Sequence, residues 1–232
     1  MKFSLLSGIH SNHYALHAVL KAVRKNNIDT LLIAGDFIGY YFWPAEVFQL
    51  LEPWDVVAIR GNHDKMLGKA EKDKQYLQRM TKKYGSGLKV ALEQLDHEKI
   101  NWLATLPDSK EYKLVNESIL ICHGSPWNVD EYVYPDAESE ILDRYASLDV
   151  NYVLQGHTHH PMIKKVRDIT VINAGSVGQP RNRQPGAQWA MLDTEQRKVV
   201  HYCEPYDSSK IILEAKKRDP GIPYLADVMV RT

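Results

Sequence analysis

The chain has few features of a secreted or membrane-bound protein. It contains only two cysteines in 232 residues, Cys122 and Cys203, and both lie in strand-like stretches. We therefore expect free, buried thiols in a reducing compartment rather than a disulfide framework. No apolar run approaches the roughly 20 residues that cross a bilayer, and the N-terminus lacks the cationic and apolar regions of a signal peptide. These absences predict a cytoplasmic protein that does not bind membranes.

The sequence also lacks an excess of charge of either sign. Lysine and arginine together number 29, and so do aspartate and glutamate. Proteins that wrap a long nucleic acid depend on clustered positive charge, so we expect no long nucleic-acid partner. No linker, repeat or low-complexity segment divides the chain. The sequence thus predicts a single domain over residues 1–232, and it leaves open whether the protein forms a homo-oligomer.

Strand-like and helical patterns alternate in the first half of the chain, and strands dominate the second. Strands are expected at 2–7, 30–34, 56–60, 118–122, 151–155, 169–173, 187–193 and 198–202. Helices are expected at 13–26, 45–51, 65–83, 88–95, 98–106, 136–147 and 208–217. In the first helix Leu16, Val19, Leu20 and Val23 recur at the spacing of one helix face. This order predicts an α/β protein with two packed sheets and helices outside them.

Glycine and metal-binding residue types follow directly after five of the predicted strands. In chain order these turns are Gly8-Ile9-His10, Gly35-Asp36, Gly61-Asn62-His63-Asp64, His123-Gly124 and Gly156-His157-Thr158-His159. Ligands of α/β sheets gather beyond the carboxyl ends of the strands, and histidine, aspartate and asparagine coordinate divalent metals. Each turn alone has an ordinary structural explanation. Together they predict a metal site at one edge of the molecule.

These turns resemble the motif set of the calcineurin-like metallophosphoesterases, in their small bacterial and archaeal phosphodiesterase-like branch. The family pattern is Asp-x-His, Gly-Asp, Gly-Asn-His-Asp/Glu, a His and Gly-His-x-His, which corresponds here to 8–10, 35–36, 61–64, 123 and 156–159. The stretches GDFIGY and NAGSVGQPRN support the match, which extends from residue 1 to about residue 205. The resemblance implies a four-layer α/β/β/α sandwich of two mixed sheets flanked by helices.

The resemblance also implies an enzyme with two divalent metal ions that hydrolyses a small phosphoester. Manganese is the expected metal, and iron, nickel, cobalt and zinc are alternatives. Carried over by position, the ligands of the first ion would be His10, Asp36 and His159, and those of the second ion Asp36, Asn62, His123 and His157. Asp36 is the only carboxylate in this set, so it is the residue whose two oxygens can bridge both ions.

Four further residues receive an expected role in catalysis or substrate binding. By the resemblance, His63 would protonate the leaving group and Asp64 would orient its ring. Tyr40 opens an aromatic run that either packs into the core or forms a lip for a flat, nucleotide-like group. Arg181 either contacts the phosphate, for which its planar fork is suited, or lies on the surface.

One residue of the family pattern is missing, because Gly8 occupies the position of a metal-binding aspartate. Without that carboxylate the first ion should bind weakly or not at all. Three explanations stay open. The chain is an altered form of an active parent, or a natural enzyme that uses one metal or binds two weakly, or a catalytically impaired member that acts as a binding or protein-interaction scaffold. The survival of His63 and of every other expected ligand argues against the scaffold.

Overall fold

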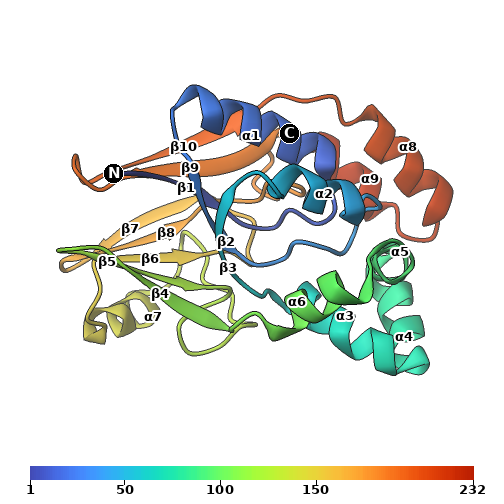
Figure 1. Ribbon diagram of the computed structural model, residues 1–232, viewed down its shortest axis with the longest axis horizontal. Helices are drawn as coiled ribbons and strands as arrows, with labels where there is room; N and C mark the ends of the chain where they lie inside the picture. Colours follow the sequence, from blue (N-terminus) through green and yellow to red (C-terminus); the bar gives the residue numbers. More distant parts are fainter.

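The computed structural model describes all 232 residues and contains two five-stranded sheets (Figure 1). The first has the order β10-β9-β1-β2-β3 and is built from β1 (Lys2–Leu6), β2 (Thr30–Ala34), β3 (Asp55–Ile59), β9 (Ala187–Asp193) and β10 (Lys198–Glu204). The second has the order β4-β5-β6-β8-β7 and is built from β4 (Ser109–Lys113), β5 (Ser118–Cys122), β6 (Tyr152–Gln155), β7 (Met162–Val166) and β8 (Ile169–Asn173). Both sheets mix parallel and antiparallel pairs.

Helices cover the outer sides of the two sheets. They are α1 (His13–Lys25), α2 (Pro44–Leu51), α3 (Asn62–Lys72), α4 (Lys74–Tyr84), α5 (Gly87–Gln94), α6 (His97–Thr105), α7 (Ser139–Asp143), α8 (Ser209–Arg218) and α9 (Tyr224–Asp227), with short 3₁₀ turns at Arg144–Ser147 and Val228–Val230. In Figure 1, α1 and α2 lie beside the first sheet and α7 beside the second. The predicted arrangement of two mixed sheets flanked by helices is confirmed.

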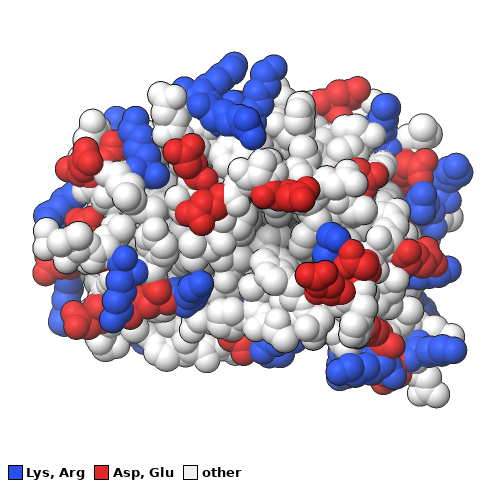
Figure 2. Space-filling model, viewed as in Figure 1, with Lys and Arg blue, Asp and Glu red and all other residues white.

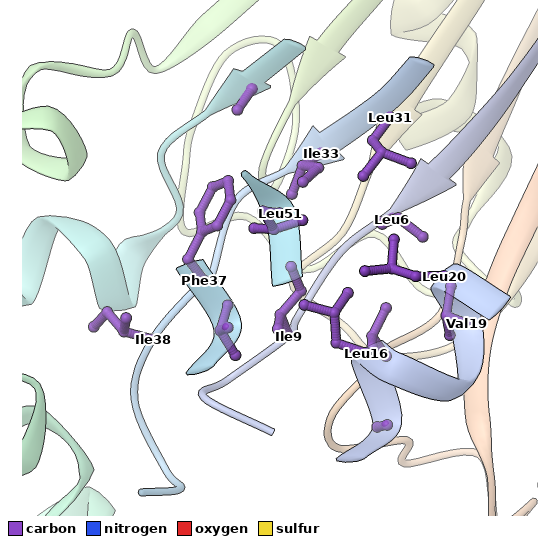
Figure 3. Packing of buried hydrophobic residues seen from close by; sticks show 14 of the residues in the cluster. Leu6, Ile9, Leu16, Val19, Leu20, Leu31, Ile33, Phe37, Ile38 and Leu51 are labelled. Atoms are coloured by element: carbon purple, nitrogen blue, oxygen red, sulfur yellow. The ribbon is translucent and has the colours of Figure 1, made fainter. Parts of the chain in front are cut away.

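The alternation of side chains along β1 and β2 divides the core into two layers. Leu6, Leu31 and Ile33 face α1, whereas Leu5 and Leu32 face the second sheet. Figure 3 shows the first layer, in which the expected helix face of Leu16, Val19 and Leu20 packs on these strands. The expected fourth member, Val23, is fully buried in the same cluster. The core therefore holds β1 and β2 rigidly from both sides, and with them the loops that follow.

Some boundaries differ from those predicted from the sequence. The helical stretch 65–83 is two helices, because Asp73 interrupts it and its carboxylate accepts the N–H of Tyr76 as the N-cap of α4. The expected helix 136–147 is helical only from residue 139. Strands β4 and β7 were not predicted. Both are edge strands, and the solvent-facing polar residues of SKEYK and MIKKV hide the strand pattern.

The C-terminal segment packs against the aromatic run that follows Asp36. Tyr41 and Phe42 are buried in one cluster with Leu225 and Met229. The Tyr41 hydroxyl donates to the carbonyl of Leu225 at 3.1 Å. This contact fixes the loop between β2 and α2, which carries several residues of the site described below.

Surface and thiol features agree only in part with the sequence. On the face in Figure 2, acidic and basic side chains are interspersed, and no continuous basic band is present on that face.

Both cysteines are free; Cys122 is buried, whereas Cys203 is only half-buried, so the expectation of two buried thiols is wrong for Cys203. None of the helices combines the length and the apolar character that a membrane span requires.

Candidate metal centre

Backbone hydrogen bonds tie together the loops that follow β1 and β2. The N–H groups of Gly8 and His10 donate to the carbonyls of Gly35 and Asp36 at 3.2 and 3.0 Å. The second sheet joins them through His123, whose Nδ1 lies 2.7 Å from the carbonyl of Ala34. The loops of both sheets therefore converge at one place, as expected for the carboxyl ends of strands.

The first half of the site contains His10, His159 and one oxygen of Asp36. The Nε2 atoms of the two histidines lie 3.0 Å apart, and Asp36 Oδ2 lies 3.6 Å from His10 Nε2. All three side chains are almost completely buried. The structure thus brings together the residues that were expected to hold the first ion.

The second half of the site is built around the same oxygen of Asp36. His123 Nε2 lies 3.3 Å from Asp36 Oδ2 and 3.0 Å from Asn62 Oδ1. His157 Nδ1 lies 3.2 Å from His123 Nε2. Asp36 therefore lies between the two halves, at the position where a shared ligand is required.

The histidine rings present lone pairs to the site. In each of three rings Nδ1 lies beside a backbone carbonyl and donates its hydrogen there: His10 to Ile38 at 3.2 Å, His123 to Ala34 at 2.7 Å and His159 to Gln179 at 2.7 Å. A neutral imidazole held in this way has an unprotonated Nε2. The Nε2 atoms of His10 and His159 then face each other without a hydrogen to share, and His123 Nε2 faces two oxygens. A cation satisfies such contacts, so these residues fit divalent metal ions.

Electrostatics favour the charge states that a metal site needs. Burial lowers the pKa of His10 and of His159 well below the usual value, and it lowers the pKa of His157 to about 4, so these rings are neutral at pH 7. Burial acts to raise the pKa of Asp36, but the adjacent rings of His123 and His63 outweigh it and hold the pKa low. Burial acts to lower the pKa of His123, but the Asp36 carboxylate and the Ala34 carbonyl outweigh it and raise that pKa. Asp36 is therefore an anion paired with His123, and the other rings beside it, those of His10, His157 and His159, are neutral nitrogen donors.

The backbone at the site is strained. Five of its residues have a positive φ between 51° and 63°, namely His10, Asp36, Tyr40, His157 and His159. A side chain in this left-handed region costs about 1–2 kcal/mol relative to the right-handed one. Such strain persists where the surrounding structure enforces it and clusters at functional sites. The strain is a second indication, independent of residue type, that this is the functional centre.

Gly8 borders the first half of the site and has a φ of +57°. A Cβ atom built there would lie 3.2 Å from His159 Nε2 and 2.7 Å from the hydroxyl of Ser176. That hydroxyl donates to the carbonyl of Gly8 at 2.7 Å and accepts the N–H of Gln179 at 2.9 Å. A side chain at position 8 would thus reach the expected ion, but Ser176 would have to move.

Asp64 does not pair with the ring of His63 as expected. Its carboxylate accepts the backbone N–H groups of Asp36 and Gly61 at 2.8 Å and of Phe37 at 3.0 Å. Asp64 is in the first turn of α3, where its carboxylate reaches back to the N-cap amide of Gly61, and the same carboxylate accepts the two amides of the loop after β2. Asp64 therefore connects the loop after β2 to the loop after β3, and it fixes the backbone of Asp36 through the Asp36 N–H.

His63 nevertheless lies beside the other site residues. Its N–H donates to Asp36 Oδ1 at 2.9 Å, and its ring lies 5.0 Å from the ring of His10. The Nδ1 atom of the ring is buried and has no hydrogen-bond partner. One ligand atom of each of His10, Asp36 and His63 also lies within 4.8 Å of the other two. One ring nitrogen of His63 is thus left without a partner beside the site.

A cavity of about 20 Å³ remains between these residues, and three tyrosines and one arginine enclose it. This volume is about that of one water molecule. Tyr40 and Arg181 line it as expected, and Arg181 Nη2 donates to the Tyr40 hydroxyl at 3.0 Å. Tyr84 and Tyr132 also line it, packed 5.2 Å from His63 and 4.1 Å from His157 between ring centres. Neither tyrosine was predicted as a site residue, because both lie outside the strand-end turns.

Comparison with known proteins agrees with this geometry. Residues 1–197 match the family model described as a calcineurin-like phosphoesterase superfamily domain. An uncharacterized protein of Methanocaldococcus jannaschii is 27% identical over 226 residues, which cover 89% of this chain and 88% of that protein. A hypothetical protein of Pyrococcus horikoshii OT3 has a TM-score of 0.86 at 24% identity and covers 99% of this chain and 98% of its own. A metallophosphoesterase of Sphaerobacter thermophilus has a TM-score of 0.80 at 23% identity, over 100% of this chain and 98% of its own. The chain therefore belongs to the calcineurin-like phosphoesterase superfamily, whose members are in general metal-dependent phosphoesterases.

Proposed function

We propose that this chain is a phosphodiesterase or phosphatase that hydrolyses a small phosphoester with two divalent cations, of which manganese is the preferred candidate. The observation that carries the proposal is the position of Asp36 Oδ2, 3.6 Å from His10 Nε2 and 3.3 Å from His123 Nε2. A single carboxylate between two groups of lone pairs is the arrangement that a pair of ions requires. When bound, such a pair neutralises phosphoryl charge and supplies an activated water.

Each residue then has a definite role. His10, His159 and Asp36 hold the first ion, and Asp36, Asn62, His123 and His157 hold the second. The backbone carbonyls that accept the Nδ1 hydrogens keep three of these rings oriented. Because Gly8 contributes no carboxylate, we expect the first half to bind its ion more weakly than the second half.

His63 is the proposed acid for the leaving group. Its unpartnered Nδ1 is free to carry a proton toward the leaving oxygen. Burial lowers the pKa of His63 to about 4, and an anionic phosphoester beside the ring would shift it upward by favouring the charged form. Asp64 is a positioning residue in this scheme, because its carboxylate is fully used on backbone amides.

Arg181 and Tyr40 form the proposed phosphate-binding wall. Arg181 is the only lysine or arginine that lines the cavity. Its Nη2 atom donates to the Tyr40 hydroxyl and to Gln179 Oε1, whereas Nε is buried without a partner, so the guanidinium keeps donors for a phosphate oxygen. A cavity of about 20 Å³ holds no phosphoester, so Tyr84 or Tyr132 has to move when the substrate binds.

The proposal is tested with metal-free protein to which Mn²⁺ is returned. Hydrolysis of 4-nitrophenyl phosphate and of bis(4-nitrophenyl) phosphate is followed by the yellow product. We expect Mn²⁺-dependent turnover of at least one ester, and Asp36→Asn should abolish it whereas Asp207→Asn, on an exposed aspartate, should not. Bound Mn²⁺ with no turnover of either ester would contradict the proposed hydrolytic activity and favour a binding scaffold.

A further inference from the structure

Two histidines and a cysteine outside the candidate metal centre line one cavity. The cavity has a volume of about 310 Å³, and His160, His201 and Cys203 lie in its wall. No aspartate, glutamate, lysine or arginine lines it, so no charged side chain of the protein repels or replaces a cation there. Imidazole nitrogen and thiolate sulfur are the donors that proteins use most for zinc.

His201 and Cys203 lie on the same face of β10. They are two residues apart, and side chains at that spacing point to the same side of a sheet. Their Cα atoms are separated by about 6–7 Å along the strand. Tyr202, between them, points to the opposite side and stacks on the buried Trp189 at 4.5 Å between ring centres. The histidine and the cysteine are therefore left on the side of the cavity.

Hydrogen bonds to backbone carbonyls fix the hydrogen on one nitrogen of each histidine ring. His201 donates from Nε2 to the carbonyl of Asn173 at 2.8 Å, and His160 donates from Nδ1 to the carbonyl of Thr158 at 2.9 Å. Burial lowers the pKa of His201, which favours its neutral ring. A neutral ring held in this way carries a lone pair on its other nitrogen, which is Nδ1 of His201 and Nε2 of His160. Histidines that bind metals are usually oriented by such a carbonyl.

Asn173, at the end of β8, positions both rings. Its carbonyl accepts the ring hydrogen of His201, and its side-chain amide donates to Thr158 Oγ1 at 3.0 Å and to the carbonyl of Gly156 at 2.6 Å. Thr158 in turn accepts the ring hydrogen of His160. A single hydrogen-bonded frame therefore holds the two imidazoles at one cavity.

The thiol of Cys203 is half-buried and has only a weak partner. Its Sγ donates to the carbonyl of Pro185 at 3.5 Å. A thiol is a weak donor, so little is lost when a metal ion takes the place of this hydrogen. Burial raises the pKa of Cys203, so the thiol is protonated at pH 7, and a bound ion has to displace that proton.

We propose that His160, His201 and Cys203 bind a Zn²⁺ ion at a site separate from the phosphoesterase centre. Two neutral imidazoles and one thiolate supply three positions of a tetrahedron, and water takes the fourth. On binding, the Cys203 sulfur exchanges its hydrogen for the metal, and the proton passes to solvent. The ion joins β10 to the turn that carries His157 and His159, so it fixes a part of the catalytic centre without entering the reaction. The site needs no hydrolytic activity and stands apart from the proposed function.

The test uses Co²⁺ as a spectroscopic substitute for Zn²⁺ in metal-free, reduced protein. A Co²⁺–thiolate bond absorbs strongly in the near ultraviolet, and the residues of the catalytic centre include no cysteine, so this band reports on the new site alone. We expect the band in the native protein and in Cys122→Ala, whose cysteine is buried outside the cavity, and not in Cys203→Ser. Excess Zn²⁺ should remove it. In zinc-loaded native protein, X-ray absorption should show a sulfur atom about 2.3 Å from zinc.

The histidines are tested by titration with Co²⁺, followed by the thiolate band. His160→Ala and His201→Ala should each weaken binding at least about tenfold, whereas His17→Ala, exposed on α1, should leave it unchanged. Absence of the band at millimolar Co²⁺ would overturn the inference, and so would a band that survives in Cys203→Ser. Unchanged affinity in both histidine variants would also overturn it. Because each readout is a binding signal, a protein without phosphoesterase activity gives the same decision.

Discussion

The Nε2 atoms of His10 and His159 lie 3.0 Å apart, beside the position where residue 8 has no side chain. Both rings donate Nδ1–H to a carbonyl, so both present lone pairs. Two lone pairs at this distance repel each other unless a positive charge lies between them. The first half of the centre thus retains its nitrogen donors and lacks the carboxylate that would complete them.

Gly8→Asp should strengthen metal binding in the first half. The Cβ atom of the new side chain would lie 3.2 Å from His159 Nε2, and aspartate is among the residues that tolerate a positive φ. We expect the tightly bound Mn²⁺ to rise from one ion to two per chain, and turnover to rise with it, measured by metal analysis after dialysis and by nitrophenyl ester hydrolysis.

The crowding at Ser176 supplies a control for this substitution. Its hydroxyl would lie 2.7 Å from the new Cβ atom. The double variant Gly8→Asp with Ser176→Ala should therefore bind the ion of the first half at least as well as Gly8→Asp alone. If both variants bind one ion and hydrolyse the esters no faster than the native protein, the missing carboxylate at position 8 limits neither metal binding nor turnover.

His123→Ala should remove the ion of the second half and with it the activity. His123 Nε2 faces Asp36, Asn62 and His157 within 3.3 Å, so no other side chain can replace it. The matched control is His97→Ala, whose side chain is 85% exposed and far from these contacts. Calorimetric titration with Mn²⁺ should show loss of the tight site in the first variant only. Equal metal affinity in both variants would exclude His123 as a ligand.

His63→Ala should separate catalysis from metal binding. We expect kcat for an alkyl phosphoester to fall by about 10²–10⁴-fold, the usual contribution of a positioned acid, with Mn²⁺ content unchanged. The fall should be much smaller for a nitrophenyl ester, because nitrophenolate leaves without a proton. Equal losses for both esters would show that His63 acts in another way.

Asp64→Asn tests the positioning role that replaces the one expected from the sequence. The carboxylate accepts three backbone N–H groups, and an amide cannot accept them all. Burial and the nearby Asp36 charge raise the pKa of Asp64 to about 7, so the carboxylate is fully charged only above that pH. Above pH 8 we expect the free energy of unfolding to fall by about 1.5–3 kcal/mol, the size of a hydrogen bond to a charged group, measured by urea denaturation. Asp136→Asn, on an exposed loop, is the control. A variant of unchanged stability that has lost activity would point back to a direct role on His63.

Arg181→Lys tests the phosphate wall, because lysine keeps the charge but cannot hold Tyr40 and a phosphate oxygen with one planar group. We expect KM to rise about tenfold, or about 1.4 kcal/mol, with a smaller change in kcat. Arg183→Lys, an exposed neighbour, should behave like the native protein. A KM that does not change would remove Arg181 from the substrate site.

The sequence predicted the parts of this molecule that depend on local patterns. Apolar runs identified the strands around Asp36 and His123, and the turns after them identified all six expected ligands, which the structure brings together. These features are visible because strand ends and glycine turns leave a direct signature in the residue order.

Features that depend on tertiary contacts were not visible. Tyr84 and Tyr132 reach the site from a helix end and a long loop, and nothing in their own neighbourhood marks them. The pairing of Asp64 with backbone amides was not visible either, because two of its three partners, the amides of Asp36 and Phe37, lie 28 and 27 residues away and reach it only in the folded protein. The positive φ of Gly8 and the crowding at Ser176 require the packed structure.

The most direct test of the account is a crystal of the protein grown with Mn²⁺ and measured at the manganese absorption edge. We predict a full anomalous peak in contact with Asp36, His123 and His157, and a weaker peak between Asp36, His10 and His159. In Gly8→Asp the weaker peak should reach full height. Manganese bound elsewhere, with none in contact with Asp36, would contradict the proposed centre.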